Sequence, residues 1–321
     1  MYDSPDMDNA RPSPARELEV SSGHAGRRLD KFLRSQLKGV PGGLVFRLLR
    51  KGAVRVNGKR AKPDYRIQAG DVIRVPALEI PEAAPVKTLP AELLRQIDRA
   101  ILHEDDSLLV LNKPADLAVH VGTGVTGGVI EALRQLRPAE PDLELVHRID
   151  KETSGLLMVA RTPSMLRHLQ QVMRDDAAVR RHYLALVQGF FPQETTYVRA
   201  PLLTTEHGVR VDPQGQPAHT RFRVLRRFGR QATLVRAELI TGRKHQIRVH
   251  TRHTGHPIAG DRKYGDPGFT REVQRLGGAR MFLHASELRI PLPSGELLHL
   301  TAPTSPVWDR TLDRLATPAR R

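Results

Sequence analysis

The residues best placed to do chemistry in this 321-residue chain surround one carboxylate, Asp150. Positions 145–155 read Leu-Val-His-Arg-Ile-Asp-Lys-Glu-Thr-Ser-Gly, so Arg148 and Lys151 lie close to Asp150 on either side. An opposite charge within a few ångströms lowers a carboxyl pKa by roughly 1–3 units, which keeps the group ionised and able to act as a base or nucleophile. The same pattern is also typical of a turn aspartate in a surface ion pair, which contributes little to stability.

A second segment, 242–253, is rich in cations and carries a candidate partner for this carboxylate. The alternation in 246–250 predicts a β-strand, with Arg248 on one face and Ile247 on the other. A half-buried arginine needs a carboxylate nearby, because an unpaired charge inside a protein costs several kcal/mol. We predict that Asp150 is that carboxylate.

Tyr183 begins a strand-like run, 183–188, in a chain whose aromatic residues make up only 4%. A tyrosine ring in this position can stack on a nucleic-acid base, an interaction worth roughly 1–3 kcal/mol. A half-buried tyrosine with a purely structural role gives the same pattern.

The sequence disfavours metal and cofactor chemistry. There are no cysteines, which excludes thiol catalysis and cysteine-ligated metal sites. The glycine-rich run 119–128 lacks the Gly-Lys-Ser/Thr of a phosphate-binding loop, and we expect a flexible loop beside the site. Histidines at positions 245, 250, 253 and 256 have no carboxylate at ligand spacing, and their Arg and Lys neighbours repel a metal cation. We therefore predict neither a metal nor a cofactor.

The overall charge indicates a polyanionic partner. With 51 Lys and Arg against 35 Asp and Glu, the formal net charge is +16, which favours nucleic acid. A basic enzyme without such a partner is the plainer alternative. No apolar segment approaches the roughly 18 residues that cross a bilayer, and the N-terminus has no signal-peptide pattern, so we predict a cytoplasmic protein that does not enter membranes. The lack of cysteine suits that compartment.

Element patterns predict two domains with different roles. The boundaries that we expect are a disordered tail (1–16), a small α/β domain (17–76), a Pro-rich linker (77–95), a large domain (96–305) and a C-terminal tail (306–321). In the small domain, a helix presents the cationic residues Arg47, Arg50 and Lys51 at spacings of three and four. An Asn-Gly pair at 57–58 predicts a tight hairpin.

In the large domain, helices and strands alternate and then give way to strands. We expect helices at 129–137 and 164–174, and strands at 155–161, 183–188, 220–224 and 233–239. The fold class is therefore mixed α/β (α+β), with a largely antiparallel mixed sheet flanked by helices.

Two resemblances connect these motifs. The small domain, with its Gly52 to Gly58 run and its Gln-Ala-Gly-Asp turn at 68–71, resembles the S4-type RNA-binding domain. Across residues 17–305, five motifs occur in the order found in the RluA/RluC/RluD family of RNA pseudouridine synthases: His-Arg-Ile-Asp-x-x-Thr-Ser-Gly at 147–155, Tyr-Leu-Ala at 183–185, Gly-Arg-x-His-Gln-Ile-Arg-x-His at 242–250, Gly-Asp-x-x-Tyr-Gly at 260–265 and Phe-Leu-His-Ala at 282–285. The residues before Asp150 are most similar to the RluC branch, which modifies 23S ribosomal RNA.

The resemblance implies a reaction in which uracil leaves its ribose, turns and rejoins through carbon 5. No atoms enter or leave, so no cofactor is required. The resemblance implies that Asp150 is the catalytic base or nucleophile and that Arg248 is its ion-pair partner. It implies that the Tyr183 ring stacks on uracil and that Ile247 forms part of the apolar pocket wall. It implies that Arg148 fills the gap left in the RNA. His120, in the glycine-rich run, is expected to contact substrate. The family usually has Leu at position 149 and often Lys at 181, where this chain has Ile and Arg.

The expected partner is ribosomal RNA or an assembling large ribosomal subunit, bound by a monomer. Other functions remain open from the sequence. RluD- or RluA-type specificity would direct the enzyme to other 23S sites or to tRNA. A non-catalytic RNA-binding or ribosome-assembly protein would keep the basic small domain without needing Asp150, Tyr183 and Arg248 together. A metal-dependent nuclease would use the histidines instead.

Overall fold

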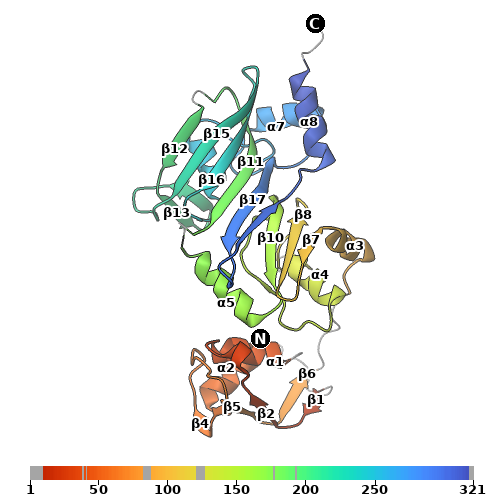
Figure 1. Ribbon diagram of the computed structural model, residues 1–321, viewed down its shortest axis with the longest axis vertical. Helices are drawn as coiled ribbons and strands as arrows, with labels where there is room; N and C mark the ends of the chain where they lie inside the picture. Colours follow the sequence, from red (N-terminus) through yellow and green to blue (C-terminus); the bar gives the residue numbers. More distant parts are fainter. Residues whose placement is uncertain are drawn as a thin grey trace, which may run out of the picture. The chain divides into compact units, whose positions relative to one another are not determined.

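The computed structural model describes residues 10–37, 40, 42–81, 88–120, 127–175, 178–191 and 194–317. The chain forms two compact units, the first comprising residues up to Thr88 and the second most of the chain from Leu89 onward (Figure 1). Residues 1–9 of the expected N-terminal tail and 121–126 of the glycine-rich run lie outside the described residues.

The first unit is a small sheet packed on two helices. Its elements are β1 (Ala10–Ser13), β2 (Arg16–Glu19), the 3-10 turn η1 (Ser22–His24), α1 (Leu29–Gln36), α2 (Gly42–Lys51), β3 (Arg55–Val56), β4 (Lys59–Arg60), β5 (Val72–Val75) and β6 (Leu78–Pro81). Strands β2-β5-β3-β4 form one sheet, and β1 pairs with β6. Apolar side chains of the helices and the sheet, among them Leu33, Leu49 and Ile73, form the core of this unit.

The predicted hairpin is present at the β3–β4 turn. Asn57 and Gly58 both have positive φ, 48° and 77°, as a tight two-residue hairpin turn requires. Asp71 is buried behind this turn and accepts hydrogen bonds from Asn57 Nδ2 (2.8 Å) and from the Gln68 backbone N–H (2.7 Å). The carboxylate therefore stabilises two turns of the small unit at once.

The second unit is built on one long sheet. Its elements are α3 (Ala91–Arg99), β7 (Ile101–Glu104), β8 (Leu108–Lys113), α4 (Val129–Leu136), β9 (Glu144–Leu145), β10 (Ser154–Ala160), α5 (Pro163–Val172), β11 (Arg180–Gln188), β12 (Thr195–Arg199), β13 (Leu202–Thr205), β14 (Gly208–Val211), β15 (His219–Phe228), β16 (Ala232–Leu239), α6 (Gln246–His253), α7 (Pro267–Arg275), β17 (Leu283–Pro291), β18 (Leu297–Thr301) and α8 (Pro306–Ala316).

The sheet order is β12-β15-β16-β11-β17-β10-β8-β7, with β18 beside β17 and β9 beside β10. Among the strand pairs of the described chain, β10 and β17 run parallel and the others antiparallel. The expected mixed, largely antiparallel sheet is thus confirmed. The parallel pair joins the two halves of the sheet.

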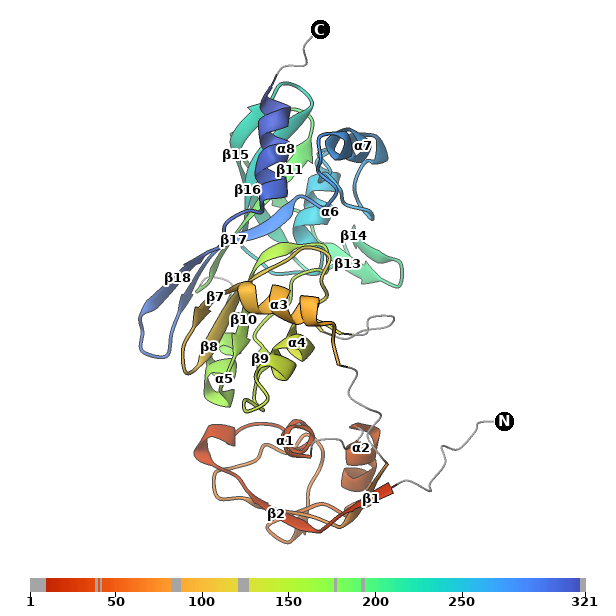
Figure 2. The ribbon, with the colours of Figure 1, turned by 90° about the vertical axis from the view of Figure 1, so that its right-hand side faces the viewer.

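Helices cover the two halves differently. Under β12, β15, β16 and β11, one face packs against side chains of the helices α6, α7 and α8. Figure 2 shows α6 and α7 on one side of these strands. In the other half, alternate residues of β8 and β10 face α5 on one side and α3 with α4 on the other. None of the helices in the described part is long and apolar enough to cross a membrane.

Four expectations about elements were wrong. The described part of the expected disordered tail, 10–16, contains β1 and the first residue of β2. Segment 246–250 is not a strand but the start of α6, which is buried on nearly all sides and therefore shows no single apolar face. The expected tail from 306 contains helix α8, whose Trp308 is 1% exposed and packs on Phe282. The expected linker 77–95 contains β6 and the start of α3.

Gly155 allows the parallel strands to meet directly after the Asp150 loop. Its φ is +107°, and a Cβ built there would lie 2.2 Å from the Ala285 carbonyl oxygen on β17. Any side chain at 155 would push β10 and β17 apart.

We expect Gly155→Ala to lower the free energy of unfolding by about 2–4 kcal/mol, through left-handed strain and overpacking together. Urea denaturation measures this loss. Gly229→Ala is the matched control, because Gly229 also has positive φ (57°) but a Cβ there would meet nothing within 4 Å. Equal losses in the two variants would contradict the packing argument.

Candidate active site

Asp150 lies on the loop between β9 and β10, and both ends of this loop are anchored. Ile149 is buried in the core next to α3 and α4, and the Thr153 backbone N–H donates to the Asp150 carbonyl (3.1 Å). Lys113, fully buried at the end of β8, donates from Nζ to the carbonyls of Lys151 (3.0 Å), Pro114 and Leu117. The Asp150 side chain remains 25% exposed and faces a cavity.

Arg248 on α6 binds two carboxylates at once. Its Nη1 donates to Asp150 Oδ2 at 2.7 Å, the predicted pair. Its Nε and Nη2 donate to Asp261 Oδ2 (2.7 Å) and Oδ1 (2.8 Å) in a bidentate contact. Asp261 was not predicted from sequence, although it lies in the Gly-Asp-x-x-Tyr-Gly motif. Asp150 is therefore held at Oδ2 by a single guanidinium nitrogen, and its Oδ1 lies 3.7 Å from His245 Nε2.

The protonation states of this buried group follow from its contacts. Burial alone would lower the pKa of Arg248, but the hydrogen bonds and charge of Asp261, and then of Asp150, raise it above its ordinary value. Burial alone would raise the pKa of Asp261, but Arg248 and the backbone N–H groups of Tyr264 and Lys263 lower it. Arg248 and Asp261 are thus a charged pair at neutral pH.

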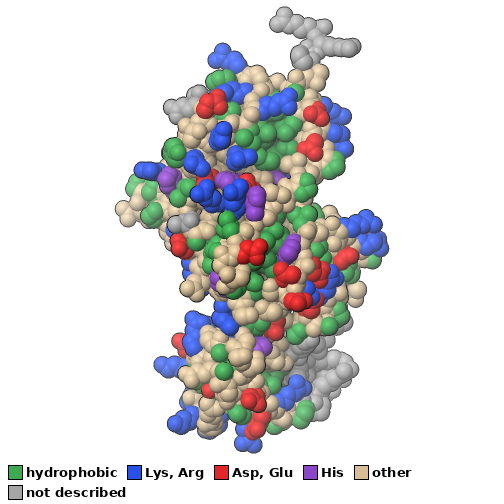
Figure 3. Space-filling model, in the orientation of Figure 1, with side chains coloured by type: hydrophobic (Ala, Val, Ile, Leu, Met, Phe, Trp, Pro, Cys, Tyr) green, Lys and Arg blue, Asp and Glu red, His purple; other side chains and the backbone are tan. Residues whose placement is uncertain are grey.

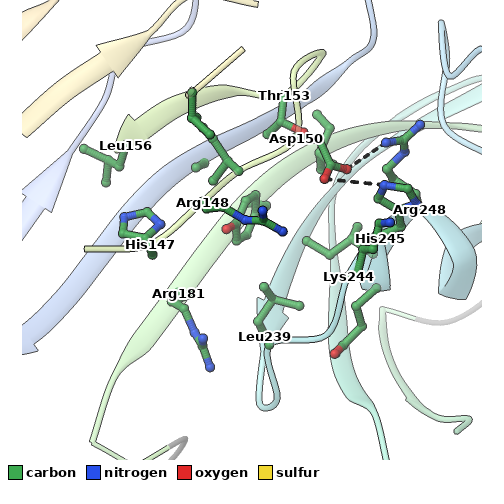
Figure 4. A pocket seen from close by; sticks show the side chains of 18 of the residues that line it. His147, Arg148, Asp150, Thr153, Leu156, Arg181, Leu239, Lys244, His245 and Arg248 are labelled. Atoms are coloured by element: carbon green, nitrogen blue, oxygen red, sulfur yellow. Dashed lines mark hydrogen bonds and ion pairs between the residues drawn. The ribbon is translucent and has the colours of Figure 1, made fainter. Parts of the chain in front are cut away.

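His245 is a further neighbour of Asp150 that the sequence did not single out. It precedes α6 with a left-handed φ of 54°, and its Nε2 lies 3.7 Å from Asp150 Oδ1 (Figure 4). On the other side, its Nδ1 lies 2.8 Å from the Tyr264 hydroxyl, which accepts a hydrogen bond from the Val209 N–H (3.0 Å).

The tautomer of His245 can be assigned from this network. Burial lowers the pKa of His245, with Arg248 acting in the same direction and Asp150 against it, so the ring is neutral at pH 7. Because the Val209 N–H already donates to Tyr264, we assign the hydroxyl proton to the bond toward His245 Nδ1. The ring proton then lies on Nε2, facing Asp150.

The cavity in front of Asp150 encloses about 540 Å³, a volume typical of small-molecule sites. Tyr183 on β11 lines it, as do Ile247 on α6 and the exposed Arg148. Burial raises the pKa of Tyr183 to about 12, so its hydroxyl keeps its proton at neutral pH. Figure 4 shows the Arg148 guanidinium reaching into the space between His147 and Arg248.

The remaining predicted site residues differ in their positions. His120 is exposed and lines the same cavity. Arg47, Arg50 and Lys51 are exposed on α2 of the first unit. Among the histidines that were weighed and rejected as metal ligands, His250 contacts the Thr220 hydroxyl and the Ala200 carbonyl.

Comparison with known proteins decides the family. A family model described as RNA pseudouridylate synthase matches residues 107–253, and an S4 domain model matches residues 27–73. The chain is 48% identical over 306 residues to the ribosomal large subunit pseudouridine synthase C of Pasteurella multocida, covering 93% of both chains. It is 46% identical over 307 residues to the protein of the same name from Escherichia coli K12, covering 93% of this chain and 96% of the relative.

The chain belongs to the RluA/RluC/RluD family of RNA pseudouridine synthases. Its members are isomerases. Among solved structures, human RNA pseudouridylate synthase domain containing 4 matches this synthase with a TM-score of 0.58 at 28% identity, over 70% of this chain and 95% of that one. Human RNA pseudouridylate synthase domain containing 1 matches with a TM-score of 0.54 at 26% identity, over 69% and 96%.

His147 of the synthase is a half-buried, neutral histidine beside the Asp150 loop. Its Nε2 accepts a hydrogen bond from the Met158 backbone N–H (3.2 Å), which requires the unprotonated nitrogen. Burial, with a smaller effect of Arg181, lowers the pKa of His147 to about 4.

Because the unfolded chain binds this proton near pH 6.5 and the folded synthase only near pH 4, stability falls as the pH drops through that window. We expect at most about 3 kcal/mol of this loss to come from His147. Urea denaturation at several pH values measures it, and His147→Gln should lose the corresponding part of the pH dependence. The comparison variant is His168→Gln, at another half-buried histidine, on α5. Identical pH profiles for the wild type and His147→Gln would contradict the assignment.

Proposed function

We propose that this synthase isomerises specific uridines of large-subunit (23S) ribosomal RNA to pseudouridine, with RluC-type specificity. The observation that carries the proposal is the Asp150 carboxylate, held by Arg248 at one oxygen and open to a cavity that Tyr183 lines. The substrate class is supported by the names of relatives that are 46–48% identical over more than nine-tenths of the chain.

Asp150 is the catalytic group in this proposal, as base or nucleophile toward the ribose of the target uridine. Arg248 fixes Oδ2 of the carboxylate, and the Asp150 side chain, which is 25% exposed, lines the cavity where the substrate would bind. The bidentate contact with Asp261 fixes the orientation of the guanidinium, and Arg248 meets Asp150 through Nη1 alone. The arrangement positions the carboxylate without enclosing it.

Tyr183 and Ile247 would hold the uracil. The Tyr183 ring stacks on the base, and Ile247 forms part of the apolar wall of the cavity. Because the pKa of Tyr183 is about 12, its hydroxyl can take the proton from carbon 5 only if its own proton passes on to a neighbour. Asp150, which faces the same cavity, is the group that we propose for this transfer.

Arg148 would enter the RNA where the target base has left. Extruding a base from a stack costs a few kcal/mol, and a planar guanidinium that refills the gap lowers this cost. The exposed position of Arg148 at the cavity suits this role. His120, on the same cavity, would contact the nucleotide as well.

The S4 domain would bind the RNA through α2. Exposed Arg47, Arg50 and Lys51 present three cations on one helix, which suits phosphate binding. We propose that the synthase acts as a cytoplasmic monomer, without metal or cofactor, on rRNA or on an assembling subunit.

The decisive experiment maps pseudouridine in the RNA of cells with and without this gene. Loss of sites in large-subunit rRNA supports the proposal. Loss only in tRNA would indicate RluA-type specificity, and unchanged maps would contradict the proposal.

Asp150→Asn should abolish isomerisation while rRNA binding stays within about twofold of the wild type, because the amide keeps the size of the side chain but not its charge. Tritium release from carbon 5 of labelled uridine measures the rate, and filter binding measures the affinity. Glu152→Gln is the matched control, since Glu152 is the neighbouring carboxylate at 3.9 Å from Arg248 Nη1. Retained activity in Asp150→Asn would refute the proposed role.

Replacing Arg47, Arg50 and Lys51 together by alanine should weaken rRNA binding and reduce the slope of log affinity against log salt. The reduction should be roughly 0.7–0.9 for each phosphate that the variant no longer neutralises. Arg74→Ala on β5, an arginine whose side chain is 72% exposed, is the control and should change neither. An unchanged slope in the triple variant would show that α2 does not bind phosphates.

A further inference from the structure

The sheet face turned away from α6 and α7 carries a row of polar side chains that leads to the active-site cavity. Strand register places in this row, from β12 inward, Tyr197, Arg221, Glu238, His182 and Glu287. The last two also line the cavity. The row therefore connects the outer strand β12 to the catalytic site across five strands.

The acidic members of this row are neutralised by their neighbours. Glu238 pairs with Arg221, and His182 Nδ1 lies 3.1 Å from Glu287 Oε2. Arg289 adds a further contact to Glu287 at 2.9 Å. The carboxylates beside the cavity thus bring little net negative charge to the face.

The arginines next to the row have no such compensation. Arg223 on β15 lies directly opposite Arg236 on β16, and neither has an ion-pair partner within the described chain. Arg199 on β12 contacts His219 rather than a carboxylate. Figure 3, which looks onto this face, shows Lys and Arg side chains gathered over β15 and β16. Like charges directly opposite each other destabilise a sheet, so this face gains most from a bound polyanion.

Tyr197 adds an exposed aromatic ring to this basic face. It is 58% exposed, the highest value among the large hydrophobic side chains of the described residues. Its ring lies 6.2 Å from that of His219 at a tilt of 48°, so the side chain packs against a neighbouring ring of β15. The bases of single-stranded nucleic acid stack on exposed aromatic rings of this kind, and neighbouring arginines bind the phosphates.

We propose that this face binds a single-stranded segment of the RNA next to the target uridine, with one base stacked on Tyr197 and phosphates at Arg223 and Arg236. The inference rests on the proposed function, because it takes RNA as the substrate of the cavity at the end of the row. A base-paired duplex fits less well, since its bases are already stacked on one another and do not offer a free face.

The test measures affinity for an rRNA fragment over a range of salt concentrations, together with kcat and KM. Tyr197→Ala should weaken binding roughly 5- to 100-fold and raise KM with kcat unchanged, because the stacking ring is removed but the catalytic group is not touched. Tyr197→Phe keeps the ring and should remain within about threefold of the wild type. The double variant Arg223→Ala/Arg236→Ala should reduce the salt slope by about 1.4, the value for two phosphates of single-stranded RNA.

Two controls separate this surface from general effects. The first control, Phe190→Ala, removes another aromatic ring, which is 47% exposed and follows the C-terminal end of β11. The second control, Arg271→Ala/Arg275→Ala, removes two exposed cations from α7. Both should leave affinity and slope within about twofold of the wild type, because they lie off the row. Losses of affinity in these controls equal to those of the sheet variants would overturn the proposal, as would unchanged affinity and slope in the sheet variants.

Binding is measured without turnover, so this test and that of the proposed function can fail separately. If cells without the gene keep every rRNA pseudouridine, the proposed function fails, while the binding variants still decide whether the face binds RNA. If Asp150→Asn is inactive and Tyr197→Ala binds as the wild type does, the proposed function stands and the sheet-face inference fails.

Discussion

The buried guanidinium of Arg248 determines how the rest of the active site is arranged. It is a cation with only 5% of its side chain exposed, and it would be costly without partners. Asp261 satisfies it on two nitrogens and is itself fixed by backbone N–H groups of its own turn. Only the remaining nitrogen reaches Asp150. The pair with Asp261 thus fixes the orientation of the guanidinium, and with it the point at which Arg248 meets Asp150.

This arrangement depends on the point where the two halves of the sheet join. The parallel pair β10 and β17 brings the Asp150 loop next to the strand that also pairs with β11, and β11 carries Tyr183. The helices under one half supply Arg248, while the core under the other half anchors Ile149. Tyr183 packs against the cores of both halves. Segments that are 98 residues apart, at Asp150 and Arg248, thus meet without a long connecting loop in the site.

Local sequence patterns were sufficient where a continuous apolar run, an apolar stripe or a pair of turn residues marks the element. Strands β10 and β11, helices α4 and α5 and the Asn57-Gly58 turn lie close to their predicted positions. The patterns failed at α6, where Gln246, Arg248 and His250 are buried like the apolar residues between them, because each finds a tertiary hydrogen-bond partner. Alternation of polar and apolar residues then imitates a strand. The pair of Asp150 with Arg248 was still predicted, because a buried charge requires a partner in either element.

Side-chain contacts that depend on the three-dimensional fold could not be predicted from the sequence in the same way. Asp261 and Tyr264 reach Arg248 and His245 only because α6 is a helix that begins after a left-handed residue. The unpaired arginines Arg223 and Arg236 become neighbours only through strand register. In both cases the sequence shows how many charged residues there are, but it does not show which of them lie next to each other in the fold. The fold places an arginine with two carboxylate partners at Asp150, and on the open sheet it places arginines that have no ion-pair partner among the described residues. In the two proposals, the same residue type therefore positions a catalytic carboxylate at one place and binds phosphates at the other.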